Sequence, residues 1–336
     1  MSASSPFPIP ACVAEAESAR RRPVTRRQFL TSCSGALASA LAAGPLATAT
    51  GGATGAIATA EPVIDIHHHT NYAGRTDEQL IRHQSVMGVT TTVLLPAGRF
   101  YGLDAKCGTN DTVVELQRRH PDKFIYFANE VADIEDAPET IRGFLRRGAV
   151  GIGEQKFRVG SDSRFLERIA RLAEEFGVPI LMHFQHGVYN TDIQNFHRTL
   201  EKFPRVNFIG HAQTWWGNVD AKHEQKVLYP TGPVTPGGIT DRLLADYPNI
   251  FGDHSAGSGL NFLVRDPEFA AGFIARHQDK LVFGSDCDDV LGRGPGCTGA
   301  QLLENIRKLA PNKQAERKIL YGNARKLLKL QGPVQK

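Results

Sequence analysis

Three consecutive histidines follow an acid at the end of a short β-branched run, in the stretch VIDIHHHT at 63–70. Side chains alternate along an extended strand, so His67 and His69 should share one face with Asp65, while His68 points to the other. Two imidazoles on one face can close on a single cation. The stretch alone is equally compatible with a solvated polar loop, so the decision depends on ligands elsewhere in the chain.

Apolar, β-rich runs recur along the rest of the chain and alternate with segments of helical spacing. The strand-like runs are PVIDIH (62–67), TTTVLLP (90–96), KFIYFANEV (123–131), AVGIGEQKF (149–157), VPILMHF (178–184), VNFIGHA (206–212), NIFGDHS (249–255) and KLVFGSD (280–286). Segments such as DEQLIRHQSVMG and SRFLERIARLAEEFG between them predict helices. Eight βα units favour an α/β fold of the (β/α)8 TIM-barrel type. A doubly wound sheet is the alternative, but no GxGxxG follows the first strand.

Polar side chains gather at the ends of these predicted strands. In a barrel the carboxyl ends of all strands meet at one face, which is where chemistry occurs. The strand-end residues able to bind a metal or move a proton are His67, His69, Glu154, Lys156, His183, His211, Asp253, His254 and Asp286. Their recurrence at ends that converge only in a closed barrel favours the metal interpretation of VIDIHHHT.

The sequence resembles the amidohydrolase superfamily. The resemblance rests on D-x-H-x-H in the first strand, LMHF and FIGHA at the fifth and sixth, and FGSD at the eighth. With the tail ILYGNARKLLKL (319–330), these motifs are similar to the second amidohydrolase branch, which contains aminocarboxymuconate-semialdehyde decarboxylase. The resemblance covers about residues 62–330 and implies a distorted TIM barrel with a divalent metal at the strand ends.

The resemblance also implies roles for individual residues. The positions that match the metal ligands of one-metal members are His67, His69, His183 and Asp286. His211 matches a histidine that contacts substrate in one-metal members and binds the second ion in two-metal members. Glu154 resembles a metal-binding glutamate of the TatD-like nucleases, whereas other members use a carboxylated lysine, for which Lys156 is the candidate. A structural salt bridge on the fourth strand is the alternative for both.

These ligand types suit a catalytic metal. Zinc accepts histidine and carboxylate ligands and keeps one position open, and manganese, iron or cobalt would also accept them. We expect one or two divalent ions, most simply Zn²⁺, with Asp286 as general base and then acid and His211 as a donor to the developing negative charge. Cys287 should face away from the metal as a buried thiol.

Candidate substrate contacts follow the strand ends. Trp215 and Trp216 are candidates for stacking on a ring or closing a lid, with packing as the alternative. The other candidates are Arg99, His186, Lys156 and His254, for which solvated loop positions are the alternative. His254 and Asp253 are neighbours on a strand, so only one of the two can face the barrel mouth.

Residues 1–60 differ from the rest of the chain. TRRQFLT at 25–31 precedes an uncharged Ala/Gly-rich run, and the Arg26–Arg27 pair resembles a twin-arginine export signal. We therefore expect a signal peptide and leader at 1–60, a single barrel domain at 61–336, and a periplasmic product of the twin-arginine export machinery. The apolar run is shorter than the roughly 20 residues that a membrane span needs, so the mature chain should carry no stable span.

Charge and cysteine content narrow the classes of partner. Five arginines against two glutamates give residues 1–60 a net charge of +3, which leaves +1 of the chain's +4 for residues 61–336. This balance gives no support to a nucleic-acid partner. Three cysteines remain beyond residue 60. This number does not indicate a disulfide scaffold, but it is compatible with one disulfide. A small-molecule substrate is expected, and a homo-oligomer is compatible with the sequence.

Three functions compete. The leading hypothesis is a metal-dependent hydrolase that cleaves an amide, ester or lactone-type bond of a small molecule with metal-activated water. The second is a metal-dependent, non-oxidative decarboxylase of a small carboxylic acid. The third is a non-catalytic exported binding protein on a degenerate barrel, which is disfavoured because no matched ligand position is lost.

Overall fold

The computed structural model describes residues 61–99 and 107–331, all within the segment Ala58–Lys336 that forms one compact unit. The expected signal segment, 1–60, lies outside the described residues, so export and cleavage stay predictions. Within the described ranges no helix is both long and apolar enough to span a bilayer.

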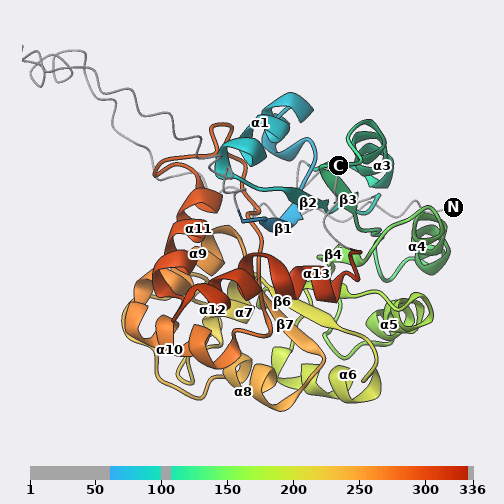
Figure 1. Ribbon diagram of the computed structural model, residues 1–336. Coiled ribbons are helices and arrows are strands. Elements are labelled where there is room, and N and C mark those ends of the chain that lie inside the picture. Colours follow the sequence, from blue (N-terminus) through green and yellow to red (C-terminus); the bar gives the residue numbers. More distant parts are fainter. Residues whose placement is uncertain (1–60, 100–106, 332–336) are drawn as a thin grey trace, which may run out of the picture. The chain divides into compact units, whose positions relative to one another are not determined.

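Eight parallel strands form the centre of the fold (Figure 1). They are β1 (Ile64–His68), β2 (Thr91–Leu94), β3 (Phe124–Tyr126), β4 (Ile152–Gln155), β5 (Ile180–His183), β6 (Phe208–His211), β7 (Ile250–His254) and β8 (Leu281–Phe283). Hydrogen bonds connect them into two sheets, one with the strand order β1-β2-β3 and one with the order β4-β5-β6-β7-β8. The predicted strands are therefore confirmed, although the third is much shorter than the run at 123–131.

Two junctions join the sheets into a barrel. Ala128, just after β3, pairs in parallel with Ile152 of β4, and its amide donates to the Gly151 carbonyl at 2.9 Å. At the other junction the amide of Asp286 donates to the His67 carbonyl at 2.8 Å, which ties the end of β8 to β1. The fold is a (β/α)8 barrel, as the strand–helix alternation predicts.

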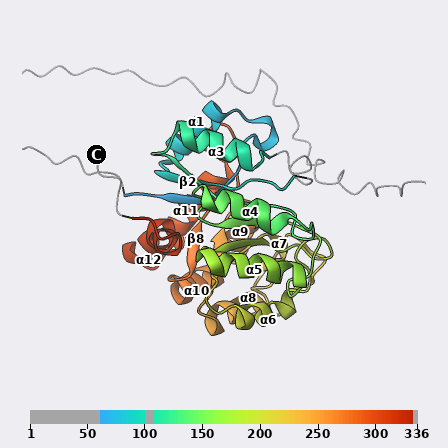
Figure 2. The same cartoon turned by 90° about the vertical axis from the view of Figure 1, so that its right-hand side faces the viewer.

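Helices surround the strands in both views (Figures 1 and 2). They are α1 (Asp77–Met87), α3 (Asn110–Arg119), α4 (Ala137–Arg146), α5 (Arg164–Phe176), α6 (Phe196–Lys202), α7 (Gln213–Gly217), α8 (Ile239–Asp246), α9 (Ala256–Arg265), α10 (Pro267–His277), α11 (Thr298–Leu309), α12 (Lys313–Arg317) and α13 (Asn323–Leu327). The helices predicted at DEQLIRHQSVMG and SRFLERIARLAEEFG are confirmed as α1 and α5. Thr76 and Gln79 form a capping box at the start of α1, which ends at Gly88 in the left-handed conformation.

Hydrophobic packing fills two layers. Residues on the outer faces of the strands, such as Leu94 and Phe208, pack against the helices in the main core. Residues on the inner faces, such as Ile66, Val93 and Val282, fill the barrel interior below the strand ends. The barrel interior is therefore packed with side chains, and the polar residues are confined to one end.

Candidate metal centre

Six polar side chains meet at the carboxyl ends of the strands, and we call them the ligand cluster. They are His67 and His69 from β1 and its end, Glu154 from β4, His183 from β5, His211 from β6 and Asp286 after β8. Register explains part of this convergence, because His183 and His211 are directly opposite each other on neighbouring strands. The strand-end histidines and the Asp286 carboxylate are thus brought together by the closed barrel.

Glu154 lies at the middle of the ligand cluster, and its two oxygens face different histidines. Oε2 lies 3.6 Å from Nε2 of His69 and 3.8 Å from Nε2 of His67. Oε1 lies 3.6 Å from Nε2 of His211 and contacts Nδ1 of His183 directly. A carboxylate between two pairs of imidazoles has the geometry of a bridging ligand.

Asp286 faces the histidine pair His67 and His69 from the other side. Its Oδ1 lies 3.4 Å from Nε2 of His69, and its Oδ2 lies 3.8 Å from Nε2 of His67 and 3.7 Å from Nε2 of His211. Separations of this size are too long for hydrogen bonds but fit ligand atoms arranged around a cation with bonds of about 2.0–2.2 Å.

Hydrogen bonds on the far side of each ring orient two of these histidines. Nδ1 of His69 donates to the carbonyl of Leu95 at 2.8 Å, and a carbonyl can only accept. Nδ1 of His67 contacts Oδ2 of Asp253 at 2.7 Å. Both contacts direct Nε2 into the ligand cluster, the orientation found in metal-binding histidines.

Ser255 orients His211 in the same way. Its hydroxyl donates to Oδ2 of Asp253 at 2.7 Å and lies 2.8 Å from Nδ1 of His211. Because the hydroxyl proton is used on Asp253, Ser255 accepts from Nδ1–H of His211, and the Nε2 of His211 is left unprotonated. In this tautomer Nε2 of His211 offers a lone pair to the ligand cluster, which suits the predicted role as a metal ligand; both predicted roles of His211 stay predictions. Ser255 was missed by that reasoning, although it lies two residues after Asp253 on the same face.

His183 contacts Glu154 on one side of its ring and Gln185 on the other. Its Nε2 lies 3.3 Å from Oε1 of Gln185, while Nδ1 faces Glu154. Burial, together with the nearby Lys156 ammonium, lowers the pKa of His183 to about 4, so the ring is neutral at pH 7. Neutral imidazole is the form in which histidine binds a metal ion.

The carboxylates in and beside the ligand cluster are ionised despite their burial. Burial opposes ionisation, but His183 and His67 hold the pKa of Glu154 and of Asp286, respectively, below the usual range. The contacts of Asp253 with His67 and His211 likewise outweigh burial and lower its pKa to about 2. Against the effect of burial, Asp286 and Asp253 raise the pKa of His67 to about 10. Three buried carboxylates therefore attract a cation, and a metal ion would displace the His67 proton.

Two buried atoms in the ligand cluster have no hydrogen-bond partner among the described residues. They are Nε2 of His67 and Oδ1 of Asp286, both of which face the ligands named above. Buried polar atoms are normally paired, so these two mark where a bound ion would sit. Ligand type, orientation and charge all fit a divalent metal.

The profile of the amidohydrolase family matches residues 64–330. The chain belongs to the amidohydrolase family. This family is metal-dependent, and the chain is accordingly an enzyme with hydrolase and decarboxylase relatives in structure. No curated protein matches the sequence.

Solved structures similar to this amidohydrolase share its fold at low identity. An uncharacterised TIM-barrel protein, Bb4693 from Bordetella bronchiseptica, is 18% identical with a TM-score of 0.59, covering 80% of this chain and 98% of its own. A 2,6-dihydroxybenzoate decarboxylase from Rhizobium is 15% identical (TM-score 0.50; 81% and 100% covered). A protein from Acinetobacter baumannii, described as a probable 2-pyrone-4,6-dicarboxylic acid hydrolase, is 14% identical (TM-score 0.53; 80% and 99% covered).

A lysine and two tyrosines surround the amidohydrolase's ligand cluster. Lys156 is half-buried, and its Nζ lies 5.7 Å from the centre of the Tyr189 ring. Burial disfavours the ammonium, but Glu154 and Asp286 raise the pKa of Lys156, so it stays charged. Tyr189 and Tyr72 meet His183 and His69 edge-on, with ring centres 5.6 Å and 5.2 Å apart. Glu154 is the strand-4 residue inside the ligand cluster, and Lys156 flanks it.

Three predicted substrate contacts are corrected by the structure. Trp215 and Trp216 are 0% and 2% exposed and belong to the main hydrophobic core, so neither is free to stack on a substrate. His254 lies against Trp216 with ring centres 4.4 Å apart and also stacks on Phe262, away from the ligand cluster. Strand alternation gives the inward position to Asp253 instead.

Two further candidates lie outside the ligand cluster. The guanidinium of Arg99 is held by Glu130 at 2.6 Å and by Asp136 at 2.7 Å. His186 is exposed in the loop after β5, and its amide donates to the Thr214 hydroxyl at 2.7 Å. Asp65 also departs from expectation, because a register irregularity between Asp65 and His68 in β1 directs its carboxylate to Ser285 at 2.5 Å.

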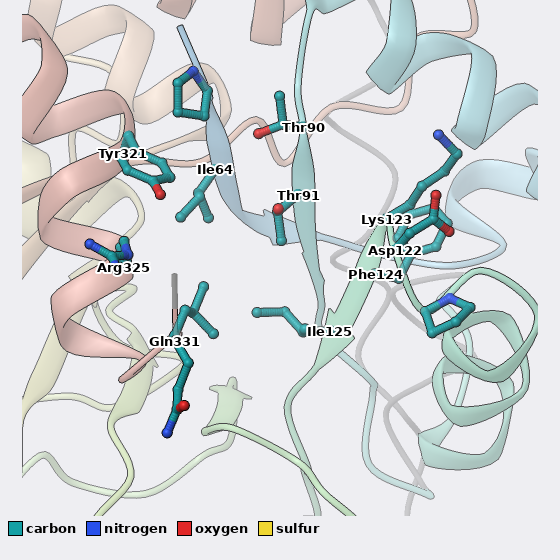
Figure 3. A pocket seen from close by; sticks show the side chains of 13 residues that line it. Ile64, Thr90, Thr91, Asp122, Lys123, Phe124, Ile125, Tyr321, Arg325 and Gln331 are labelled. Atoms are coloured by element: carbon teal, nitrogen blue, oxygen red, sulfur yellow. The ribbon is translucent and has the colours of Figure 1, made fainter. Parts of the chain in front are cut away.

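A pocket of about 330 Å³ opens at the opposite end of the barrel (Figure 3). It is lined by residues at the start of strands, such as Ile64, Thr91 and Phe124, and by Tyr321 and Arg325 near the C-terminal helix. It contains none of the ligand cluster, and the N-terminal end of a barrel is not where such enzymes react. We assign it no catalytic role.

Proposed function

We propose that this amidohydrolase is a binuclear metal-dependent hydrolase of a small anionic ester, amide or lactone. The observation that carries the proposal is the position of Glu154, whose two oxygens each face a different pair of histidines. In this assignment His67, His69 and Asp286 would hold one ion, His183 and His211 would hold the second, and Glu154 would be a ligand to both. Zinc suits this ligand set, and manganese, iron and cobalt are the alternatives.

The residues of the chain have separable tasks in hydrolysis. A bound divalent metal would supply a water of lowered pKa and polarise the scissile carbonyl. Asp286 accepts the proton of the attacking water and returns it to the leaving group, since its carboxylate is ionised at neutral pH. Asp253 and Ser255 keep His67 and His211 in the required tautomers.

Lys156 supplies the argument for an anionic substrate. Its ammonium flanks the ligand cluster, it is half-buried, and it has no hydrogen-bonded acceptor among the described residues. A carboxylate on the substrate would pair with it in a charge-assisted hydrogen bond.

The alternative is a non-oxidative decarboxylase, and the same lysine favours it. A cation beside the metal ligands would hold the carboxylate that is lost as CO₂. The structural likeness to 2,6-dihydroxybenzoate decarboxylase supports the fold and leaves this reaction open.

The two reactions are separated by one experiment. The zinc-loaded and manganese-loaded protein would be incubated in ¹⁸O-water with a panel of carboxylated lactones, esters and amides, and with carboxylated phenols. Hydrolysis predicts one ¹⁸O in the product and loss of activity with a chelator. Metal-dependent CO₂ release without ¹⁸O incorporation would establish the decarboxylase. Turnover that survives complete removal of metal would refute both.

Export through the twin-arginine machinery is part of the proposal and is supported by the sequence at 25–31. The double substitution of Arg26 and Arg27 by lysine should leave the precursor in the cytoplasm. Processing and periplasmic recovery that are unchanged in this variant would contradict it.

A further inference from the structure

Three buried donor atoms meet outside the ligand cluster, on the other side of β1, and we call them the thiol cluster. His83 comes from α1, Cys287 follows β8, and Cys297 is the N-cap of α11. Their side chains are buried, with exposures of 0%, 2% and 0%. His68 stacks on His83 at 5.6 Å, and it points away from the face that carries His67 and His69.

The distances within the thiol cluster match the edges of a coordination tetrahedron. The sulfur atoms of Cys287 and Cys297 are 3.8 Å apart, and Nε2 of His83 lies 3.4 Å from Sγ of Cys297. With Zn–S bonds of about 2.3 Å and Zn–N bonds of about 2.0–2.1 Å, tetrahedral S···S and S···N edges come to about 3.8 and 3.6 Å. A disulfide needs a sulfur separation of about 2.05 Å, far shorter than this one.

A fourth soft atom borders the site. The thioether sulfur of Met87 lies 3.9 Å from Sγ of Cys297. Two thiolates, an imidazole and a thioether form a donor set that selects zinc or cuprous copper over magnesium or calcium. This set differs from the histidine and carboxylate oxygens of the ligand cluster, so the two sites should be distinguishable by spectroscopy.

Hydrogen-bond donors and a positive charge border the thiol cluster. The Ala300 amide in the first turn of α11 donates to Sγ of Cys297 at 3.4 Å. The Arg75 guanidinium donates to the carbonyls of Cys287 and Asp289 at 2.8 and 2.9 Å, which places a positive charge beside the thiol cluster. Two thiolates and one divalent ion are neutral together, which limits the cost of burying them.

His83 has no competing use in the described part of the chain. Its Nδ1 is buried without a hydrogen-bond partner there, and its Nε2 contacts Sγ of Cys297 in the thiol cluster. We propose that His83, Cys287 and Cys297 form a second, structural metal site that takes a thiophilic ion, with Zn²⁺ as the best match. The site would fasten the segment 287–297 to α1, immediately after Asp286. It does not depend on the reaction proposed above.

Cobalt substitution tests the proposal. The full-length protein, purified under reducing conditions and depleted of metal, would be titrated with Co²⁺. The expected result is thiolate-to-cobalt charge-transfer absorption in the near ultraviolet, lost in Cys297→Ser. Serine retains the N-cap of α11, so this variant should keep its fold. His83→Gln keeps both thiols and should weaken cobalt binding at this site about 10-fold or more.

Two controls separate the thiol cluster from the ligand cluster. His69→Gln should lose cobalt at the strand ends and retain the charge-transfer band. Cys107→Ser removes a buried thiol close to His69 and should also retain the band. The proposal is overturned if the wild type shows no band, if Cys297→Ser retains it, or if Cys107→Ser loses it. A metal-free wild type with two thiols fewer than its fully reduced form, and with the missing pair mapped to Cys287 and Cys297 by peptide mass spectrometry, would establish a Cys287–Cys297 disulfide instead.

Discussion

Asp253 on β7 accepts a hydrogen bond from Nδ1 of His67 at 2.7 Å and thereby directs the other ring nitrogen of His67 into the ligand cluster. The same carboxylate oxygen accepts from Ser255, which in turn holds His211. One residue that binds no metal itself thus orients two ligands. Such partners of metal-binding histidines contribute strongly to affinity.

Asp253→Asn should therefore weaken metal binding by about 10–100-fold while the barrel remains folded. The measurement is metal affinity by competition with a chromogenic chelator. Asp241→Asn is a matched control, because Asp241 forms a similar pair with His277 at 2.6 Å outside the ligand cluster. Equal affinity in Asp253→Asn and the wild type would show that Asp253 does not orient the ligands.

Lys156→Met should raise KM for anionic substrates by about 10–100-fold, the loss expected for a hydrogen bond to a charged group. KM for a neutral ester analogue should change little. Steady-state kinetics on an anionic and neutral pair would measure this, with the exposed Lys222→Met as the control. An equal effect on both substrates would remove Lys156 from substrate recognition.

Much of the ligand cluster could be predicted from the sequence because strand ends converge in any closed barrel. His67, His69, His183, His211 and Asp286 each end or follow a buried apolar run, and the structure brings all five together. The direction of Asp65 could not be predicted, since a local register irregularity in β1 breaks strict alternation.

Packing decides the features that local patterns leave open. In the sequence, a tryptophan pair after a strand is equally compatible with a lid over the site and with the hydrophobic core. Only the tertiary contacts of Trp215 and Trp216 show that they belong to the core. Because side chains alternate along a strand, only one of Asp253 and His254 can face the barrel mouth, but the sequence does not show which one. The role of Ser255 depends on the tautomer of His211, which is a property of the assembled site.

Trp215→Ala should lower the free energy of unfolding by about 3–5 kcal/mol, because the ring is fully buried against Phe184. Denaturant unfolding of metal-loaded protein would measure it. Leu291→Ala, at a side chain 57% exposed, should stay within about 0.5 kcal/mol of the wild type. A stable Trp215→Ala with a raised KM would instead support substrate contact.

His254 should make the fold sensitive to acid. Burial lowers the pKa of His254 to about 3, below the ordinary value of 6.5 that it has in the unfolded chain. The unfolded state therefore binds the proton first, so this contribution to stability is complete above pH 6.5 and is lost as the pH falls towards 3. Between pH 8 and pH 5 the loss is about 2 kcal/mol.

His254→Phe keeps an aromatic ring between Trp216 and Phe262 and should remove this part of the pH dependence. The measurement is the free energy of unfolding at several pH values between 5 and 8, with His186→Phe at an exposed site as the control. An identical slope in His254→Phe and the wild type would contradict the assignment.

The bridging position of Glu154 is the central claim, and metal content per chain tests it most directly. Wild-type protein purified without chelators would be compared with Glu154→Gln, and with Glu139→Gln at an exposed position as the control. We predict about two strand-end ions in the wild type and in the control, and about one in Glu154→Gln. All three proteins carry Cys297→Ser, so that a metal ion in the thiol cluster does not add to the number of ions measured. About one ion in every protein would contradict the binuclear account.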